Sequence, residues 1–147
     1  MQMPIEVMLT APSIFEDVGK SRSNWMDILL VDDSKTMRML VQRAIRQAGY
    51  RGLSFGEAEN GVQALESMHQ EKPKLVLSDW NMPEMSGIEL LQSLRKEGNK
   101  TPFGFITSES SAEIRDMAIS NGASFLLTKP FNPDDVQAAL DPFLEGC

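Results

Sequence analysis

Five polar residues that can do phosphoryl chemistry stand at or just after the ends of short apolar runs. Asp32 and Asp33 follow the first run, Asp79 the third, Thr107 the fourth and Lys129 the fifth. Three carboxylates close together cannot all stay ionised without a cation, and hard oxygen ligands favour Mg²⁺ or Mn²⁺. A hydroxyl and an ammonium opposite such a group would stabilise phosphoryl oxygens, and a carboxylate is an accepted phosphoryl nucleophile. Brought together, these side chains are equipped for phosphoryl transfer.

The elements that must position these residues follow a regular alternation. Continuous apolar runs lie at 28–31, 53–55, 75–77, 103–106 and 125–127. Runs of this length and continuity are typical of strands buried on both faces of a sheet. Each run is followed by a stretch whose apolar residues recur at helical spacing. The sequence therefore predicts five successive β-α units.

Five β-α units predict an α/β fold, in which helices cover both faces of a parallel sheet. For five strands we expect the flavodoxin-like doubly wound order 2-1-3-4-5 with five helices. In that order the strands ending near Asp33, Asp79, Thr107 and Lys129 are consecutive neighbours. Ligands of open α/β sheets bind beyond the carboxyl ends of the strands. The order therefore predicts one crevice that holds all of these side chains.

Glycine and proline residues mark the ends of the predicted helices. Gly49, Gly98 and Gly122 follow helical stretches, at positions where a left-handed C-cap favours glycine. Asn132, followed by a proline and two acidic residues, predicts the start of the last helix. Pro142 lies inside the last helical pattern, so we expect it to kink or shorten that helix.

Length, charge and cysteine content restrict the class of protein further. The 147 residues fit one domain at 25–147, preceded by an N-terminal leader segment at 1–24 without a sustained apolar period; Met26 is an alternative start. The net charge of −7 disfavours nucleic-acid binding. The single cysteine, Cys147, excludes an intramolecular disulfide. With no signal peptide and no spanning run visible, we predict a cytoplasmic protein without a membrane partner.

The sequence resembles the receiver domains of two-component response regulators, and among them the chemotaxis-type single-domain regulators. The resemblance covers about residues 27–144. It rests on Val31-Asp32-Asp33-Ser34, Asp79-Trp80-Asn81-Met82-Pro83, Gly87, Thr107-Ser108-Glu109 and Lys129-Pro130-Phe131. The resemblance implies a phosphorylation-activated signalling switch rather than a conventional enzyme. Such a switch accepts a phosphoryl group from a sensor histidine kinase and signals by contact with a downstream protein, by analogy a flagellar motor switch protein.

The resemblance assigns the acidic residues to phosphorylation and metal binding. Asp79 would be the phosphoacceptor. Asp33, Asp79 and the backbone carbonyl of Asn81 would ligate Mg²⁺ directly, and Asp32 would hold a metal-bound water. Mn²⁺ is the alternative ion.

The resemblance also assigns the remaining polar positions. Thr107 would bond a phosphoryl oxygen and move inward on phosphorylation, and Lys129 would pair with Asp79 and then with the phosphoryl group. Asn81 and Glu109 occupy the two positions that tune hydrolysis of the acyl phosphate in the family. The peptide bond between Lys129 and Pro130 would be cis.

Leu126 and Trp80 stand near the predicted site. The family usually has Tyr or Phe three residues before the lysine, as a switch on the fifth strand, and here that residue is Leu126. Phe125 is adjacent but points to the opposite face, so it cannot simply substitute. Trp80 follows the predicted acceptor, where we expect it to be exposed and to report on the site.

Four alternative functions stay open at the level of sequence. A phosphorelay intermediate has the same site residues. A Mg²⁺-dependent phosphohydrolase of the haloacid-dehalogenase type uses Asp-x-Asp, whereas this chain has Asp32-Asp33-Ser34. A flavodoxin-like cofactor carrier uses a Ser/Thr/Gly phosphate loop, whereas this chain has Lys35-Thr36-Met37-Arg38. A receiver-shaped interaction module that is never phosphorylated would not require the complete site.

Overall fold

The computed structural model describes residues 26–109 and 111–144, in which strands and helices alternate. The strands are β1 (Ile28–Val31), β2 (Phe55–Ala58), β3 (Leu75–Asp79), β4 (Phe103–Thr107) and β5 (Phe125–Thr128). The helices are α2 (Lys35–Gln47), α3 (Gly61–Gln70), α4 (Gly87–Lys96), α5 (Ala112–Ser120) and α6 (Pro133–Leu144). The predicted leader at 1–24 lies outside the described residues. No helix in the described part of the chain is long and apolar enough to cross a membrane.

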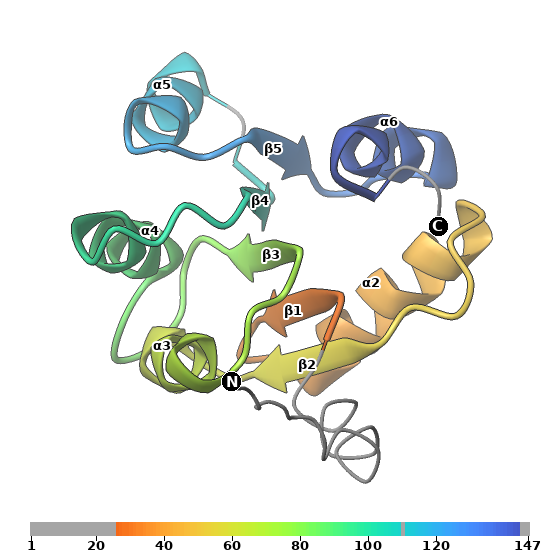
Figure 1. Cartoon of the computed structure of the whole chain (residues 1–147). Helices are drawn as coiled ribbons and strands as arrows, with labels where there is room; N and C mark the ends of the chain where they lie inside the picture. The colour runs from red at the N-terminus through yellow and green to blue at the C-terminus, as the bar shows by residue number, and fades with distance from the viewer. Residues whose placement is uncertain (1–25, 110, 145–147) are drawn as a thin grey trace, which may run out of the picture.

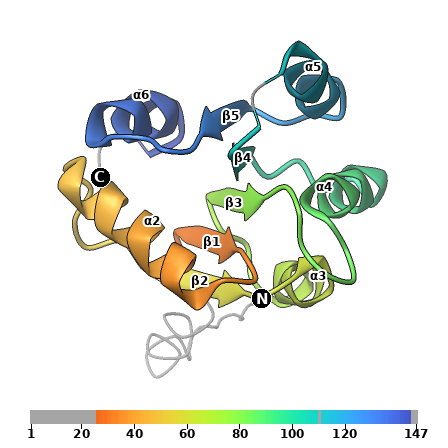
Figure 2. The same ribbon diagram turned by 180° about the vertical axis from the view of Figure 1, so that it is seen from behind.

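The five strands form one parallel sheet in the order β2-β1-β3-β4-β5, which confirms the predicted fold class. Helices α2 and α6 cover one face, and α3, α4 and α5 cover the other (Figure 1). Figure 2 shows the same two layers from behind. Because all strands run in the same direction, their carboxyl ends meet at one edge of the sheet.

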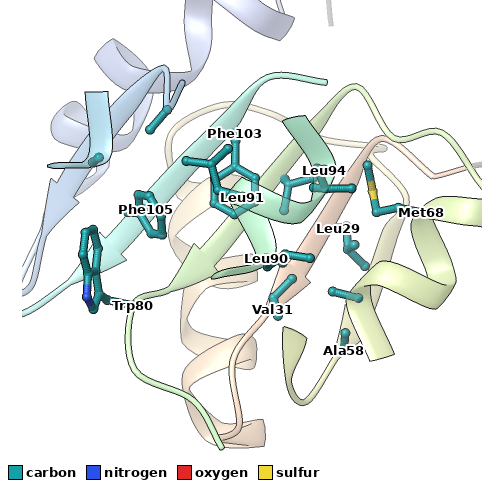
Figure 3. Close-up of a cluster of buried hydrophobic side chains, with 14 of the residues drawn as sticks. Leu29, Val31, Ala58, Met68, Trp80, Leu90, Leu91, Leu94, Phe103 and Phe105 are labelled. Atoms are coloured by element: carbon teal, nitrogen blue, oxygen red, sulfur yellow. The ribbon is translucent and has the colours of Figure 1, made fainter. Parts of the chain in front are cut away.

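Each face of the sheet has its own apolar core. The core under α3, α4 and α5 contains Leu90, Leu91 and Leu94 packed on Phe103 and Phe105 of the sheet, all fully buried (Figure 3). The core under α2 and α6 is built from further buried residues, including Ile28, Ile45, Leu75 and Leu140. These two layers hold the strand ends, and so the predicted site residues, in fixed positions.

The residues predicted to end three helices and to begin the last one do so in the structure. Gly49, Gly98 and Gly122 follow helices with positive φ angles, as predicted. Asn132 Oδ1 accepts the backbone N–H of Asp135 at 2.8 Å, which confirms the predicted start of α6. Helix α6 runs through Pro142 to Leu144, so the helix is not shortened as expected, and the expected kink stays a prediction. Pro142 and the residue one turn before it, Ala138, are exposed, so water can reach the backbone there.

The second strand differs from the prediction in its position. The strand runs from Phe55 to Ala58. It therefore begins two residues after the start of the apolar run at 53–55. β2 is an edge strand that contains Gly56 and the exposed Glu57, so its apolar pattern is weak. The Asp27 carboxylate accepts the backbone N–H of Ser54 at 2.8 Å and fixes the chain just before the strand.

Candidate functional site

Three carboxylates meet at the carboxyl edge of the sheet. Asp32 and Asp33 follow β1, and Asp79 is the last residue of β3. β1 and β3 are hydrogen-bonded neighbours in which Val31 lies opposite Ser78, so the next residues of the two strands are also adjacent. One carboxylate oxygen from each aspartate lies within 4.8 Å of the others. The structure thus brings together the acidic residues that the sequence singled out.

The loop after β1 is held by hydrogen bonds on both sides of Asp32. Its backbone N–H donates to the carbonyl of Ala58 on β2 at 3.0 Å. Its carboxylate Oδ1 accepts the backbone N–H of Ser34 at 2.9 Å, and Ser34 in turn caps α2. Asp32 is buried while Asp33 is exposed. The cluster of Asp32, Asp33 and Asp79, called the acidic pocket below, therefore has one carboxylate in the protein interior and one that faces solvent.

Lys129 brings positive charge to the cluster from β5. Its ammonium Nζ lies 3.7 Å from Asp79 Oδ1. Its backbone N–H donates to the carbonyl of Thr107 at 2.8 Å, which ties the loop after β5 to the end of β4. The peptide bond between Lys129 and Pro130 is cis, as the resemblance implied.

Thr107 is the buried end of β4, with 2 % of its surface exposed. Its hydroxyl Oγ1 accepts the backbone N–H of Glu109 at 3.2 Å. β4 pairs with β3 so that Asp79 lies opposite Ile106, which places Thr107 one residue beyond the acceptor level. The hydroxyl and the ammonium of Lys129 therefore stand on the β4–β5 side of the carboxylates.

Burial disfavours the ionised form of two carboxyl groups in the acidic pocket. It raises the pKa of Asp79, and the nearby Lys129 only partly opposes this effect. Burial also raises the pKa of Asp32, an effect that the N–H of Ser34 opposes and the charge of Asp79 reinforces. Both groups are thus more easily protonated than a free aspartate. A cation bound between them would relieve the same penalty.

The donor set fits a hard divalent cation. All three side chains offer carboxylate oxygens, and the exposed Asp33 leaves the pocket open to water. Mg²⁺ and Mn²⁺ prefer oxygen ligands and retain bound water, whereas zinc sites favour nitrogen and sulfur. The described residues thus form an acidic pocket suited to such an ion.

The expectation that Trp80 is exposed is wrong. Only 7 % of its surface is accessible, and its ring packs against Phe105 with centroids 4.6 Å apart (Figure 3). Trp80 follows Asp79 and points into the core under α4, since successive residues at a strand end alternate in direction. It still touches the site through its backbone, whose N–H donates to Asp79 Oδ1 at 2.8 Å.

The remaining predicted positions lie in the loops after β3 and β4 and on β5. Asn81 and Glu109 are exposed, in the loops after β3 and β4. Leu126 is half-buried against the core under α3, α4 and α5. Phe125 faces the other way, where its ring packs against Phe143 of α6 with centroids 5.9 Å apart. The two faces of β5 are thus occupied as the alternation rule predicts.

Sequence reasoning missed Arg38 as a residue of this region. Its guanidinium is buried and donates hydrogen bonds to the carbonyl of Asp32 and to the carboxylate of Glu57. A signal was available, because Arg38 stands three and seven residues before Val41 and Ile45, the other buried residues of α2. This spacing places Arg38 on the buried face of the helix, but it does not identify the groups that its guanidinium bonds.

Fold and pocket together define a class: an open α/β domain with an acidic pocket at the carboxyl edge of its sheet. Comparison with known proteins makes the class specific. The family model for the response regulator receiver domain matches residues 28–141. The chain belongs to this family, as the motifs had suggested.

Individual relatives agree with the family model. The chemotaxis protein CheY1 of Helicobacter pylori is 34% identical over 122 residues, which cover 81% of this chain and 97% of that protein. The CheY homolog of Campylobacter jejuni is also 34% identical, over 81% of this chain and 92% of that protein. The solved structure of chemotaxis protein CheY4 from Vibrio cholerae superposes with a TM-score of 0.71 at 33% identity, and covers 82% of this chain and 99% of that one.

Proposed function

We propose that this protein is a phosphorylation-activated switch that accepts a phosphoryl group on Asp79 from a sensor histidine kinase. The observation that carries the proposal is the meeting of Asp32, Asp33, Asp79 and Lys129 at one edge of a receiver-type sheet. The chain would catalyse its own phosphorylation and dephosphorylation, and it would not turn over a separate substrate as a conventional enzyme does.

Asp33, Asp79 and the backbone carbonyl of Asn81 would hold Mg²⁺, and Asp32 would hold a water bound to it. Mn²⁺ satisfies the same oxygen ligands. The bound ion supplies positive charge that offsets the negative charge of the phosphoryl oxygens. The raised pKa values of Asp32 and Asp79 support this assignment, since an added cation relieves the crowding that raises them.

Asp79 would act as the nucleophile of the transfer. One of its carboxylate oxygens attacks phosphorus, an O–P bond forms, and the N–P bond of the donor phosphohistidine breaks. The bonding electron pair returns to the imidazole nitrogen of the donor. Lys129, 3.7 Å from Asp79, would then pair with the phosphoryl oxygens. Thr107 would donate its hydroxyl hydrogen to one of them while it still accepts the Glu109 N–H.

The output would be contact with a downstream protein. The names of the related proteins from Helicobacter pylori and Campylobacter jejuni point to chemotaxis, and a flagellar motor switch protein is the partner suggested by analogy. Asn81 and Glu109 are exposed in the loops beside the acidic pocket, which supports a role for them in the lifetime of the acyl phosphate. The movement of Thr107 toward the phosphoryl group would change the surface around the loop after β4.

The proposal is tested by mixing the protein with acetyl phosphate and Mg²⁺ and measuring the intact mass over time. We expect one transient phosphoryl adduct in the wild-type protein and none in Asp79→Asn. The matched control is Asp116→Asn, an exposed carboxylate on α5, which should be phosphorylated normally. Sustained hydrolysis of many equivalents, or an adduct on Asp79→Asn, would contradict the proposal.

A further inference from the structure

Arg38 connects three elements beneath the acidic pocket. It lies on the buried face of α2 with 8 % of its surface exposed. Its Nη1 donates to the backbone carbonyl of Asp32, and its Nε donates to Glu57 Oε1 on β2 at 2.7 Å. One side chain thus joins α2, the edge strand β2 and the loop that follows β1.

The hydrogen bond to Asp32 has consequences for two carboxylates. The carbonyl of Asp32 belongs to the peptide group that links Asp32 to Asp33, and a peptide group is planar. Fixing the direction of this carbonyl therefore fixes the plane between the two Cα atoms. Since each Cα carries a carboxylate of the pocket, Arg38 sets how both side chains leave the backbone.

Arg38 is the third restraint on this short segment. The N–H of Asp32 is bonded to Ala58, and its carboxylate is bonded to Ser34. These two bonds leave the carbonyl to be oriented separately, and the planar guanidinium does this while it also bonds Glu57. Glu57 offsets the positive charge of Arg38, so the acidic pocket keeps its negative charge.

We propose that Arg38 is a positioning residue for divalent-cation binding, which acts by holding the peptide group between Asp32 and Asp33. The proposal rests on the cation site described under the proposed function. Groups that orient metal ligands typically change metal affinity by about 10–100-fold when removed. A residue that merely joined α2 to β2 would affect stability and leave the affinity unchanged.

The test compares Mg²⁺ affinity, by calorimetric titration of the full-length protein, with thermal stability in the absence of the ion. In Arg38→Met we expect about tenfold weaker Mg²⁺ binding. The matched control is Glu57→Gln, which removes the ion pair but retains an acceptor and the bond between Arg38 and Asp32. We expect wild-type Mg²⁺ affinity in Glu57→Gln, whatever its stability.

A second substitution keeps the test decisive if Arg38→Met does not fold. Arg38→Lys retains the charge but offers a single ammonium in place of the two-pronged guanidinium. We expect its Mg²⁺ affinity to lie between those of the wild-type protein and Arg38→Met. If Arg38→Met does not fold by circular dichroism, the comparison of Arg38→Lys with Glu57→Gln decides.

The outcomes separate this inference from the proposed function. Equal Mg²⁺ affinity in the wild-type protein and the folded Arg38 variants overturns the positioning role alone. Weakened binding in Glu57→Gln to the same degree overturns it too, because the ion pair would then be the cause. Wild-type protein that binds Mg²⁺ but is never phosphorylated overturns the proposed function alone. Wild-type protein that does not bind Mg²⁺ overturns the cation site and this proposal with it.

Discussion

Replacing Asp79 by asparagine should raise the stability of the protein when no divalent cation is present. The substitution removes one of three negative charges whose oxygens lie within 4.8 Å of one another. Asparagine is nearly isosteric, and its amide oxygen can still accept the N–H of Trp80 that now bonds Asp79 Oδ1. The change in charge therefore dominates the effect.

The magnitude follows from two opposing interactions. At 4.8 Å, two unit charges repel by about 1 kcal/mol in water and about 3 kcal/mol at an effective dielectric constant of 20. Asp79 has two such neighbours, while its attraction to Lys129 at 3.7 Å is about 1 kcal/mol in water and about 4 kcal/mol at the lower dielectric constant. Asp33 is exposed, so its repulsion lies near the water value. With water values for all three interactions, the net gain on removing the charge is about 1 kcal/mol, or roughly 3–5 °C in Tm. At the lower dielectric constant the repulsion and the attraction nearly cancel, and the burial that raises the pKa of Asp79 supplies the gain.

The pH dependence distinguishes this explanation from a general effect of the substitution. Because the pKa of Asp79 is raised in the folded state, the folded protein binds this proton more tightly than the unfolded chain does. The penalty is therefore absent below the unfolded pKa of about 3.9 and develops as the pH rises through the folded pKa. The stability of Asp79→Asn relative to wild type should accordingly rise from acidic to neutral pH and then level off.

The assay is thermal unfolding in EDTA at several pH values, with Asp116→Asn as the control for net charge. Asp116 is exposed on α5, so its substitution should change Tm little at any pH. The reasoning is refuted if Asp79→Asn is no more stable than wild type at pH 7. It is also refuted if the gain at pH 7 is the same at pH 4, since a pH-independent gain cannot come from the charge.

Three further predictions concern the ion, the switch and the packing between β4 and β5. Mg²⁺ at about ten times its Kd should stabilise the wild-type protein by about 1–2 kcal/mol and change Trp80 fluorescence. If Mg²⁺ at about 10 mM, a suggested assay concentration, shifts neither Tm nor the emission, the cation site is contradicted. Thr107→Ala should be phosphorylated nearly normally, yet it should lose the amide shifts that beryllofluoride induces around residues 108–112 in NMR spectra. Leu126→Ala should retain these shifts and mainly lose packing stability. The reverse pattern would place the switch on β5. Gly104→Ala should destabilise the protein by about 1–3 kcal/mol in chemical unfolding, because a Cβ there would lie 2.2 Å from the ring of Phe125; an unchanged midpoint would contradict this packing.

The sequence was most informative where a strand is central. β1 and β3 are buried on both faces, so their apolar runs are continuous, and the polar residues that follow are unmistakable. The predicted order of the sheet was then enough to place Asp32, Asp33 and Asp79 together. The edge strand β2 was misplaced because Gly56 and Glu57 interrupt its apolar pattern, and its partial exposure permits them.

Within the site, the sequence analysis did not predict the direction of two side chains, those of Trp80 and Arg38. The identity of Trp80 gave no indication of whether its ring follows the strand alternation into the core or turns to solvent. The buried position of Arg38 depends on a partner, Glu57, that stands 19 residues away on another element. Pairings of this kind arise from tertiary packing, which local periodicity does not describe.

The roles of individual residues stay predictions until phosphorylation itself is located. The most direct measurement is to phosphorylate the wild-type protein with acetyl phosphate and Mg²⁺, reduce the acyl phosphate with borohydride, and sequence the tryptic peptides by mass spectrometry. We predict that the modification falls in the peptide of residues 75–95, which trypsin releases after Lys74 and Arg95, and within it at position 79. Modification at Asp32, Asp33 or any other residue, or none in protein shown to bind Mg²⁺, would contradict the assignment of Asp79 as the phosphoacceptor.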